Sequence, residues 1–244
     1  MKNHAPGVFL FGLVTMVSMT LLYGADVGKS WIEVSGSTAK EYEVPIRAVQ
    51  TEEPKTALTF NASWPEDGIR EILDALNSGG MKAAFFVAEE WAGSHPEELR
   101  EMAESGHELG ILGDGQKTKE ELTEEKERLE ELAGKEIWLY RSEEEICSRE
   151  TIRAAGDCGL RTVGWSLDSL DWKEYGADAI IRQISENLES GSIILCRTDG
   201  GHTAEALAGM DKMLAARGFE TVTLSGLLGG GEGYIDRDGT WIPA

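Results

Sequence analysis

The stretch KTALTFNAS, residues 55–63, decides the fold of this chain. Ala57, Leu58 and Phe60 form a short apolar run with the β-branched Thr59 inside it, a pattern typical of a buried β-strand. The run ends at Asn61, where a strand of a parallel α/β sheet opens onto its functional face. A catalytic barrel is expected to carry a carboxylate there, so the amide of Asn61 makes activity the central question.

Downstream of this strand the chain alternates between strand and helix patterns. The predicted strands cover residues 55–61, 83–88, 108–113, 137–141, 161–167, 192–198 and 219–224. Apolar residues between them recur at helical spacing, as in Ile69, Ile72, Leu73 and Leu76. Such units predict a parallel sheet with right-handed crossovers. No GxGxxG follows the first strand and no GKS/T loop occurs, so a barrel is favoured over an open doubly wound sheet.

Composition excludes two classes of partner. The 244 residues include 23 basic and 44 acidic side chains, for a net charge of −21. This acidity argues against nucleic acid, whose phosphates need Lys and Arg, and against binding to an anionic lipid surface. Three cysteines make no disulfide framework and are interpreted as small buried groups, with a Cys147–Cys158 bridge as the alternative.

The N-terminal segment is uncharged from residue 5 to residue 25. Residues 1–25 are therefore interpreted as a membrane anchor helix or a signal segment, with Lys2 placing the rest of the chain outside the cytoplasm. The expected location is the cell membrane in a single pass, or secretion if the segment is cleaved. Residues 26–54 form an extended linker with short strands at Trp31–Val34 and around Tyr42–Val49, and residues 230–244 form a C-terminal tail.

Six stretches of the chain resemble, in the same order, segments of the NodB-homology polysaccharide deacetylases (carbohydrate esterase family 4). These are VPIRAVQTEEPKTALTF (44–60), MKAAFFVAEEW (81–91), HPEELREMAESGHELG (95–110), WSLDSLDW (165–172), GSIILCRTD (191–199) and HTAEALAGMDKMLAARGFETVTLSGLL (202–228). Within that family the chain looks like the membrane-anchored sporulation branch. The resemblance implies an α/β fold, a distorted (β/α)7 barrel over residues 55–229 with an N-terminal anchor helix.

The resemblance also implies a chemistry, in which a divalent cation such as zinc or cobalt activates water to remove an acetyl group from a sugar amine. A carboxylate serves as base and a histidine as acid. Laid over this chain, the base position falls on Asn61, the metal ligands on Ala62, Leu112 and Gln116, and the acid on Arg197. The positions that match the family pattern are Arg141, Asp168, Asp171 and Trp172.

The expected site therefore has two parts and no metal ligands. The residues that align with the family's catalytic motifs, whether or not they are identical to them, are Asn61, Arg141, Asp168 and Arg197. The residues expected to contact a glycan are Trp64, Gln116, Asp171 and Trp172. No cofactor is expected. Two alternatives stay open: that Asp168 and Asp171 pair with Arg141 or cap the next helix, and that the tryptophans belong to the core.

The resulting hypothesis is an inactive family member of the cell envelope that binds or scaffolds cell-wall or spore-cortex glycan. It contacts the membrane through residues 5–25, and the sequence identifies no protein partner. One alternative is an active deacetylase of peptidoglycan or chitooligosaccharide with a rearranged site. Its candidate groups lie near the carboxyl ends of predicted strands: Asp114, Asp168, Asp171, Asp199 and His202. The other is a structural sporulation protein that binds no sugar.

Overall fold

A computed structural model describes residues 43–63 and 68–244. The expected anchor at 1–25, the expected strand Trp31–Val34 and Trp64 lie outside these ranges. Within the two ranges no helix is long and apolar enough to cross a membrane.

The main sheet of the described chain has eight parallel strands. They are β2 (Lys55–Ala62), β3 (Ala83–Val87), β4 (Glu108–Gly113), β5 (Leu139–Ser142), β6 (Arg161–Thr162), β7 (Leu167–Asp168), β8 (Ile193–Arg197) and β9 (Glu220–Thr221). Their order is β6-β5-β4-β3-β2-β8-β7, and β9 pairs with the start of β2. This curled parallel sheet confirms the predicted α/β barrel of the (β/α)7 type.

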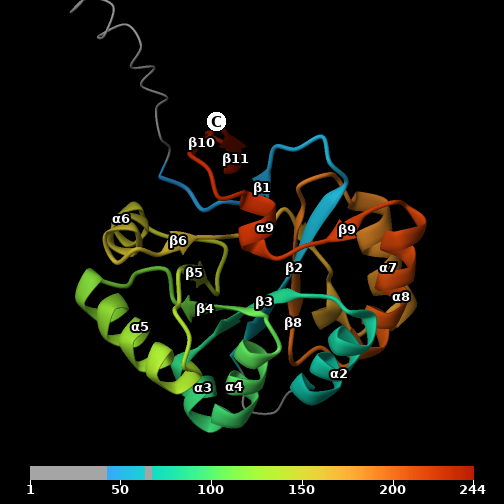
Figure 1. Ribbon diagram of the computed structural model, residues 1–244, viewed down its shortest axis with the longest axis horizontal. Helices are drawn as coiled ribbons and strands as arrows, with labels where there is room; N and C mark the ends of the chain where they lie inside the picture. Colours follow the sequence, from blue (N-terminus) through green and yellow to red (C-terminus); the bar gives the residue numbers. More distant parts are fainter. Residues whose placement is uncertain (1–42, 64–67) are drawn as a thin grey trace, which may run out of the picture. The chain divides into compact units, whose positions relative to one another are not determined.

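Helices follow the strands along the chain and surround the curled sheet (Figure 1). They are α2 (Ile69–Gly79), α3 (Glu89–Ser94), α4 (Pro96–Glu104), α5 (Lys119–Ala133), α6 (Arg149–Asp157), α7 (Ala177–Asn187), α8 (Thr203–Ala216), α9 (Leu224–Leu228) and the short 3-10 helix η1 (Asp171–Lys173). The periodic face of α2, predicted from its spacing, is buried against the sheet at Ile69, Ile72, Leu73 and Leu76.

Strand β2 lies at the centre because both of its faces are covered. Leu58 and Phe60 join the apolar cluster under the helices, and Ala57 joins a second cluster inside the curl of the sheet. Every residue from Thr56 to Ala62 is buried, which explains the apolar run without polar alternation.

The sheet does not close into a full ring. The single strand predicted at 161–167 is wrong: it splits into β6 and β7, which lie at opposite ends of the strand order. Between them the carbonyls of Val163 and Gly164 accept hydrogen bonds from the Arg141 side chain, at 3.1 and 2.8 Å. Ile46 bonds to Thr162 and Gly164 at 2.9 and 2.8 Å, so side-chain and loop contacts replace the missing ladder.

A second, three-stranded sheet covers the amino ends of the barrel strands. It joins β1 (Ala48–Val49), β11 (Thr240–Pro243) and β10 (Gly233–Ile235) in that order. Residues 230–244, expected as a tail, thus contain a hairpin, and Asp238-Gly239 with a φ of +87° at Gly239 supplies its turn. The strand predicted at 219–224 is shorter than expected, because Thr223 caps α9 through the amide of Gly226.

The three cysteines are free thiols. Cys196 is fully buried, as expected, whereas Cys147 and Cys158 are only partly covered. The alternative of a Cys147–Cys158 bridge is therefore wrong for this structure.

Candidate functional site

Strand register brings the family motif positions to one level of the barrel. Asn61 on β2 lies beside Phe86 on β3 and Arg197 on β8. On the next strands Leu112 pairs with Arg141, and on the other side of β8 Asp168 pairs with Leu195. The positions that the family alignment connects therefore lie at the carboxyl ends of neighbouring parallel strands, where barrel enzymes hold their sites.

Arg141 on β5 is the buried residue at the base of this site. Its side chain is fully buried, with the guanidinium carbon 3.9 Å from the centre of the Phe86 ring. Besides the two carbonyls that it bonds, its Nη1 donates to Asn61 Oδ1 at 3.1 Å. Burial lowers the pKa of Arg141 to about 9, so the group stays cationic at neutral pH.

The contact between Arg141 and Asn61 determines what Asn61 can do. An amide oxygen has no useful proton affinity, and this one already accepts a hydrogen bond from a cation. Its backbone carbonyl is also engaged, by Thr198 N at 3.1 Å. Asn61 is therefore a structural partner of Arg141 in this geometry and is not a base.

Arg197, at the position of the family's acid, is held by its own strand end. Its Nε and Nη2 donate to the two carboxylate oxygens of Asp199 at 2.8 and 2.9 Å. This paired geometry raises the pKa of Arg197 above its usual value, chiefly through the hydrogen bonds to Asp199. A guanidinium held in this way cannot deliver a proton at working pH.

The segment after β7 holds two carboxylates in a strained loop. Leu170 and Glu174 have φ values of 57° and 55°, a left-handed conformation that is unfavourable for these residue types. Asp168 Oδ1 accepts the amide of Leu170 at 2.8 Å. Asp168 therefore stabilises the turn that follows it. The alternative that Asp168 pairs with Arg141 is wrong, because the Arg141 side chain donates to two main-chain carbonyls and to Asn61 instead.

Asp171 is buried behind this loop. Its Oδ2 accepts Arg197 N at 2.8 Å and Thr203 Oγ1 at 2.7 Å, which ties the loop to β8 and to the first turn of α8. Its Oδ1 has no hydrogen-bond partner among the described residues. Burial is the main cause that raises the pKa of Asp171 above the usual value of an aspartate.

The expected glycan contacts are placed differently from one another. Trp172 is 53% exposed, with Lys173 Nζ 5.1 Å from the centre of its ring, so the core alternative for this residue is wrong. Tyr175 in the same loop, which sequence reasoning missed, is 75% exposed. The loop therefore presents two aromatic rings to solvent.

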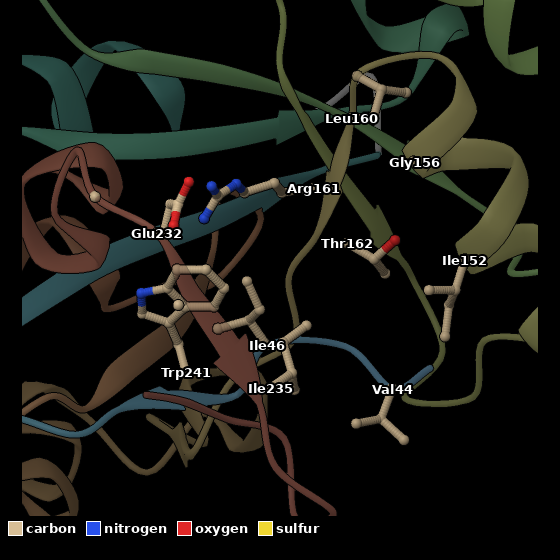
Figure 2. Close-up of a pocket in the computed structure, with 12 residues that line it drawn as sticks. Val44, Ile46, Ile152, Gly156, Leu160, Arg161, Thr162, Glu232, Ile235 and Trp241 are labelled. Carbon is tan, nitrogen blue, oxygen red and sulfur yellow. The ribbon is translucent and has the colours of Figure 1, made fainter. Parts of the chain in front are cut away.

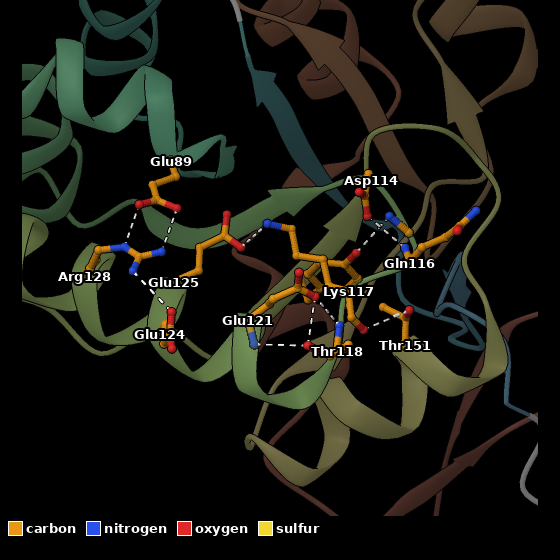
Figure 3. Close-up of polar contacts among 12 residues, drawn as sticks. Glu89, Asp114, Gln116, Lys117, Thr118, Glu121, Glu124, Glu125, Arg128 and Thr151 are labelled. Atoms are coloured by element: carbon orange, nitrogen blue, oxygen red, sulfur yellow. Dashed lines mark hydrogen bonds and ion pairs between the residues drawn. The ribbon is translucent and has the colours of Figure 1, made fainter.

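Gln116 lies apart from the floor of the site. Figure 3 shows it in the turn after β4, where its backbone N–H donates to Asp114 Oδ1 at 2.9 Å. Its neighbours are Lys117, which pairs with the buried Glu125 of α5, and Thr118, which caps α5 together with Glu121. The structure gives Gln116 no hydrogen bond to Asn61, Arg141, Asp168 or Arg197.

A cavity of about 720 Å³ opens beside the carboxyl ends of β2 and β8. Its lining includes Arg70 and Glu71 of α2, His95, Glu98 and Asp199. The Gly68 amide donates to Thr198 O at 2.9 Å and holds the start of α2 against this opening. The charged side chains of this lining offer hydrogen-bond groups that a hydroxylated ligand can use.

The residues present do not fit the divalent cation that the family uses. Ala62 and Leu112 are buried apolar residues, and Gln116 is exposed in its turn. Within residues 43–63 and 68–244, no group of three or more His, Cys, Asp or Glu side chains could hold a metal ion. The ligand positions therefore carry a methyl group, an isobutyl group and an exposed amide.

Sequence reasoning also missed the acceptors that fix Arg141. They are main-chain carbonyls of Val163 and Gly164, and any residue type supplies such groups. The only available signal was the Gly164-Trp165 pair at the interruption of the predicted strand.

This curled parallel sheet with its motif positions at the strand ends defines a carbohydrate esterase fold. The sequence profile described as polysaccharide deacetylase matches residues 48–163, and the chain is similar to that family in this part of its sequence.

Relatives span active and uncharacterized proteins. An uncharacterized 30.6 kDa protein of Geobacillus stearothermophilus is 29% identical, over 83% of this chain and 80% of that protein. A peptidoglycan-N-acetylglucosamine deacetylase of Bacillus cereus is 28% identical, over 70% of this chain and 66% of that protein. Among solved structures, a CE4 family pseudoenzyme from Bacillus anthracis has a TM-score of 0.71 at 20% identity, over 77% of this chain and 70% of that one.

Proposed function

We propose that this chain binds N-acetylated cell-wall glycan without deacetylating it. The observation that carries the proposal is the hydrogen bond that Asn61 accepts from Arg141, which leaves an engaged amide at the position where water activation needs a base. The family supports the class of ligand, because relatives include peptidoglycan and chitooligosaccharide deacetylases. The exposed rings of Trp172 and Tyr175 can stack on sugar rings, and the cavity at β2 and β8 offers charged groups for hydrogen bonds.

A catalytically inactive member has a precedent in the fold. The Bacillus anthracis neighbour is described as a CE4 family pseudoenzyme, and a mutant of it as one with restored enzymatic activity. In the present chain the base, the acid and the ligand positions all differ from the family pattern. Groups that act as a unit are not restored one at a time, so Asn61→Asp alone is expected to stay inactive.

The second candidate is a deacetylase with a rearranged site. It is favoured by Asp171, a buried carboxylate with a raised pKa and an oxygen without a partner among the described residues. Such a group is a candidate proton acceptor.

One experiment separates the two candidates. The purified protein is expected to co-sediment with insoluble peptidoglycan and to release no acetate from it, with or without added zinc or cobalt. Trp172→Ala should weaken binding by about fivefold, the loss of roughly 1 kcal/mol of stacking. Tyr234→Ala, which removes an exposed ring from β10, is the matched control and should leave binding unchanged. Acetate release that Asp168→Ala or Asp171→Asn abolishes would show an active enzyme instead.

We also propose that the protein is held at the cell membrane by residues 5–25, with the barrel outside the cytoplasm. The support is the uncharged N-terminal segment preceded by Lys2. A reporter fused after Ala244 should fractionate with membranes and be cleaved by protease added to intact protoplasts. Full-length protein in the cytosolic fraction would contradict this location.

A further inference from the structure

A second cavity, of about 550 Å³, lies between the C-terminal hairpin and α6 and is lined by none of the motif positions (Figure 2). Its walls are mainly apolar: Val44, Ile46, Ile152, Leu160, Ile235 and Trp241. A volume of this size is in the range of ligand-binding cavities. Neither the family motifs nor the glycan proposal uses any residue of this cavity.

One border of the cavity is a free strand edge on β10. In the order β1-β11-β10, strand β10 has a neighbour on one side only. The bonds from Asp236 N to Thr240 O and from Ala244 N to Glu232 O involve the even-numbered residues that flank β10 on either end. Because an antiparallel strand alternates its bonding direction, the backbone N–H and C=O of Gly233 and Ile235 point away from β11. Both residues line the cavity.

The opposite border is the outer edge of β6, which is partly covered because Ile46 forms a single parallel bridge with Val163 there. Arg161 N and Val163 N donate to β5, at Trp138 O and Tyr140 O, so the Thr162 backbone faces the other way. There Ile46 N bonds the Thr162 carbonyl at 2.9 Å, and within the described ranges no bond to the Thr162 amide accompanies it. The side chain adds a further unused group: Thr162 Oγ1 is buried, lines the cavity and has no hydrogen-bond partner among the described residues.

We propose that this cavity binds an extended, apolar peptide segment of a partner protein, which adds a strand along β10 and reaches Thr162. Free strand edges are templates for such pairing, and main-chain hydrogen bonds supply much of its affinity. The apolar walls take the alternate side chains of the peptide. Burial of an unpaired hydroxyl and of unpaired backbone groups is unfavourable, and the bound strand supplies their partners.

The charged groups around the cavity balance each other. The Arg161 guanidinium lies 4.7 Å from the centre of the Trp241 ring. The Glu232 carboxylate points toward that guanidinium in Figure 2, so the cavity has one lining group of each sign. These two groups give the lining no net charge, and burial of a peptide charge against the apolar walls would be unfavourable, so a neutral apolar strand fits best.

The test uses a fluorescein-labelled Val-Thr-Val-Thr-Val peptide, acetylated and amidated, with the full-length protein. Its anisotropy is expected to rise and saturate as protein is added. The same peptide N-methylated at alternate amides keeps every side chain and loses its strand donors, so it should bind at least roughly tenfold more weakly. Absence of saturation for the first peptide, or equal binding of the two, would overturn the proposal.

Two matched variants locate the binding. Ile235→Asp places a charge in the cavity wall and should weaken binding by roughly tenfold or more. Tyr234→Asp makes the same charge change at the next residue of β10, outside the cavity lining, and should bind within about twofold of the wild type. If both variants bind equally, the peptide does not occupy this cavity.

Thr162→Val gives an independent readout. Valine has nearly the same shape and lacks the hydroxyl, so the urea midpoint of the free protein should rise while affinity for the peptide falls. A merely structural hydroxyl would lower the midpoint when removed and leave peptide binding unchanged, which would contradict the role assigned to Thr162.

Discussion

Replacing Arg141 with alanine is expected to lower the free energy of unfolding by about 3–5 kcal/mol. The substitution leaves a cavity beside Phe86 and removes the donors of three acceptors, Val163 O, Gly164 O and Asn61 Oδ1. Each unpaired buried acceptor costs about 1–3 kcal/mol, and truncation of a large core side chain costs a further ~2–5 kcal/mol. Relief of the desolvated cation offsets part of this sum, since its pKa is lowered to about 9.

Urea denaturation of the variants measures the effect. Arg141→Lys keeps the charge but loses the planar fork that reaches both carbonyls, so it should lie between the wild type and Arg141→Ala. Asn61→Asp should raise the free energy of unfolding by about 1 kcal/mol at pH 7, because a charged acceptor strengthens the existing bond and Arg141 is already desolvated. A change below about 1 kcal/mol in Arg141→Ala would show that this side chain does not hold the gap between β6 and β7 together.

His107 is expected to make the protein lose about 2.5 kcal/mol of stability between pH 7.5 and pH 4.5. The ring is fully buried, packs edge-on to Phe85 and accepts Ala83 N at Nδ1, 3.2 Å away, while its Nε2 has no partner among the described residues. Burial, with help from Lys82 and Lys135, lowers the pKa of His107 from 6.5 to about 4. Between pH 6.5 and pH 4 the unfolded chain therefore binds a proton at His107, whereas the folded chain does not.

The sign follows from this difference in proton binding. The stability is complete above pH 6.5, falls as the pH is lowered through the window, and reaches its full loss below pH 4. His107→Asn keeps an acceptor for the Ala83 amide and has no charge to gain. The difference in free energy of unfolding between wild type and His107→Asn should therefore shrink on acidification. A difference that stays constant from pH 7.5 to 4.5 would rule out His107 as the titrating group.

Much of the fold could be predicted because its signals are local. The apolar run at 55–61 and the helical stripe at Ile69, Ile72, Leu73 and Leu76 each depend on residues a few positions apart. The failures occurred where pairing is non-local. Residues 161–167 read as one strand, yet Arg141 from another strand bonds the carbonyls of Val163 and Gly164 and interrupts it. The hairpin in residues 230–244 had a local Asp-Gly signal that was passed over.

For the candidate site, too, some features could be predicted from the sequence and others could not. The sequence by itself determined which groups are present at the motif positions, because an asparagine lacks a carboxylate and a leucine cannot bind metal in any environment. Only the tertiary structure decided the partners: Arg141 with Asn61, Arg197 with Asp199, and Asp171 with the amide of Arg197. Chemical identity is carried by each residue alone, whereas burial and hydrogen bonding depend on which distant strands the fold places side by side.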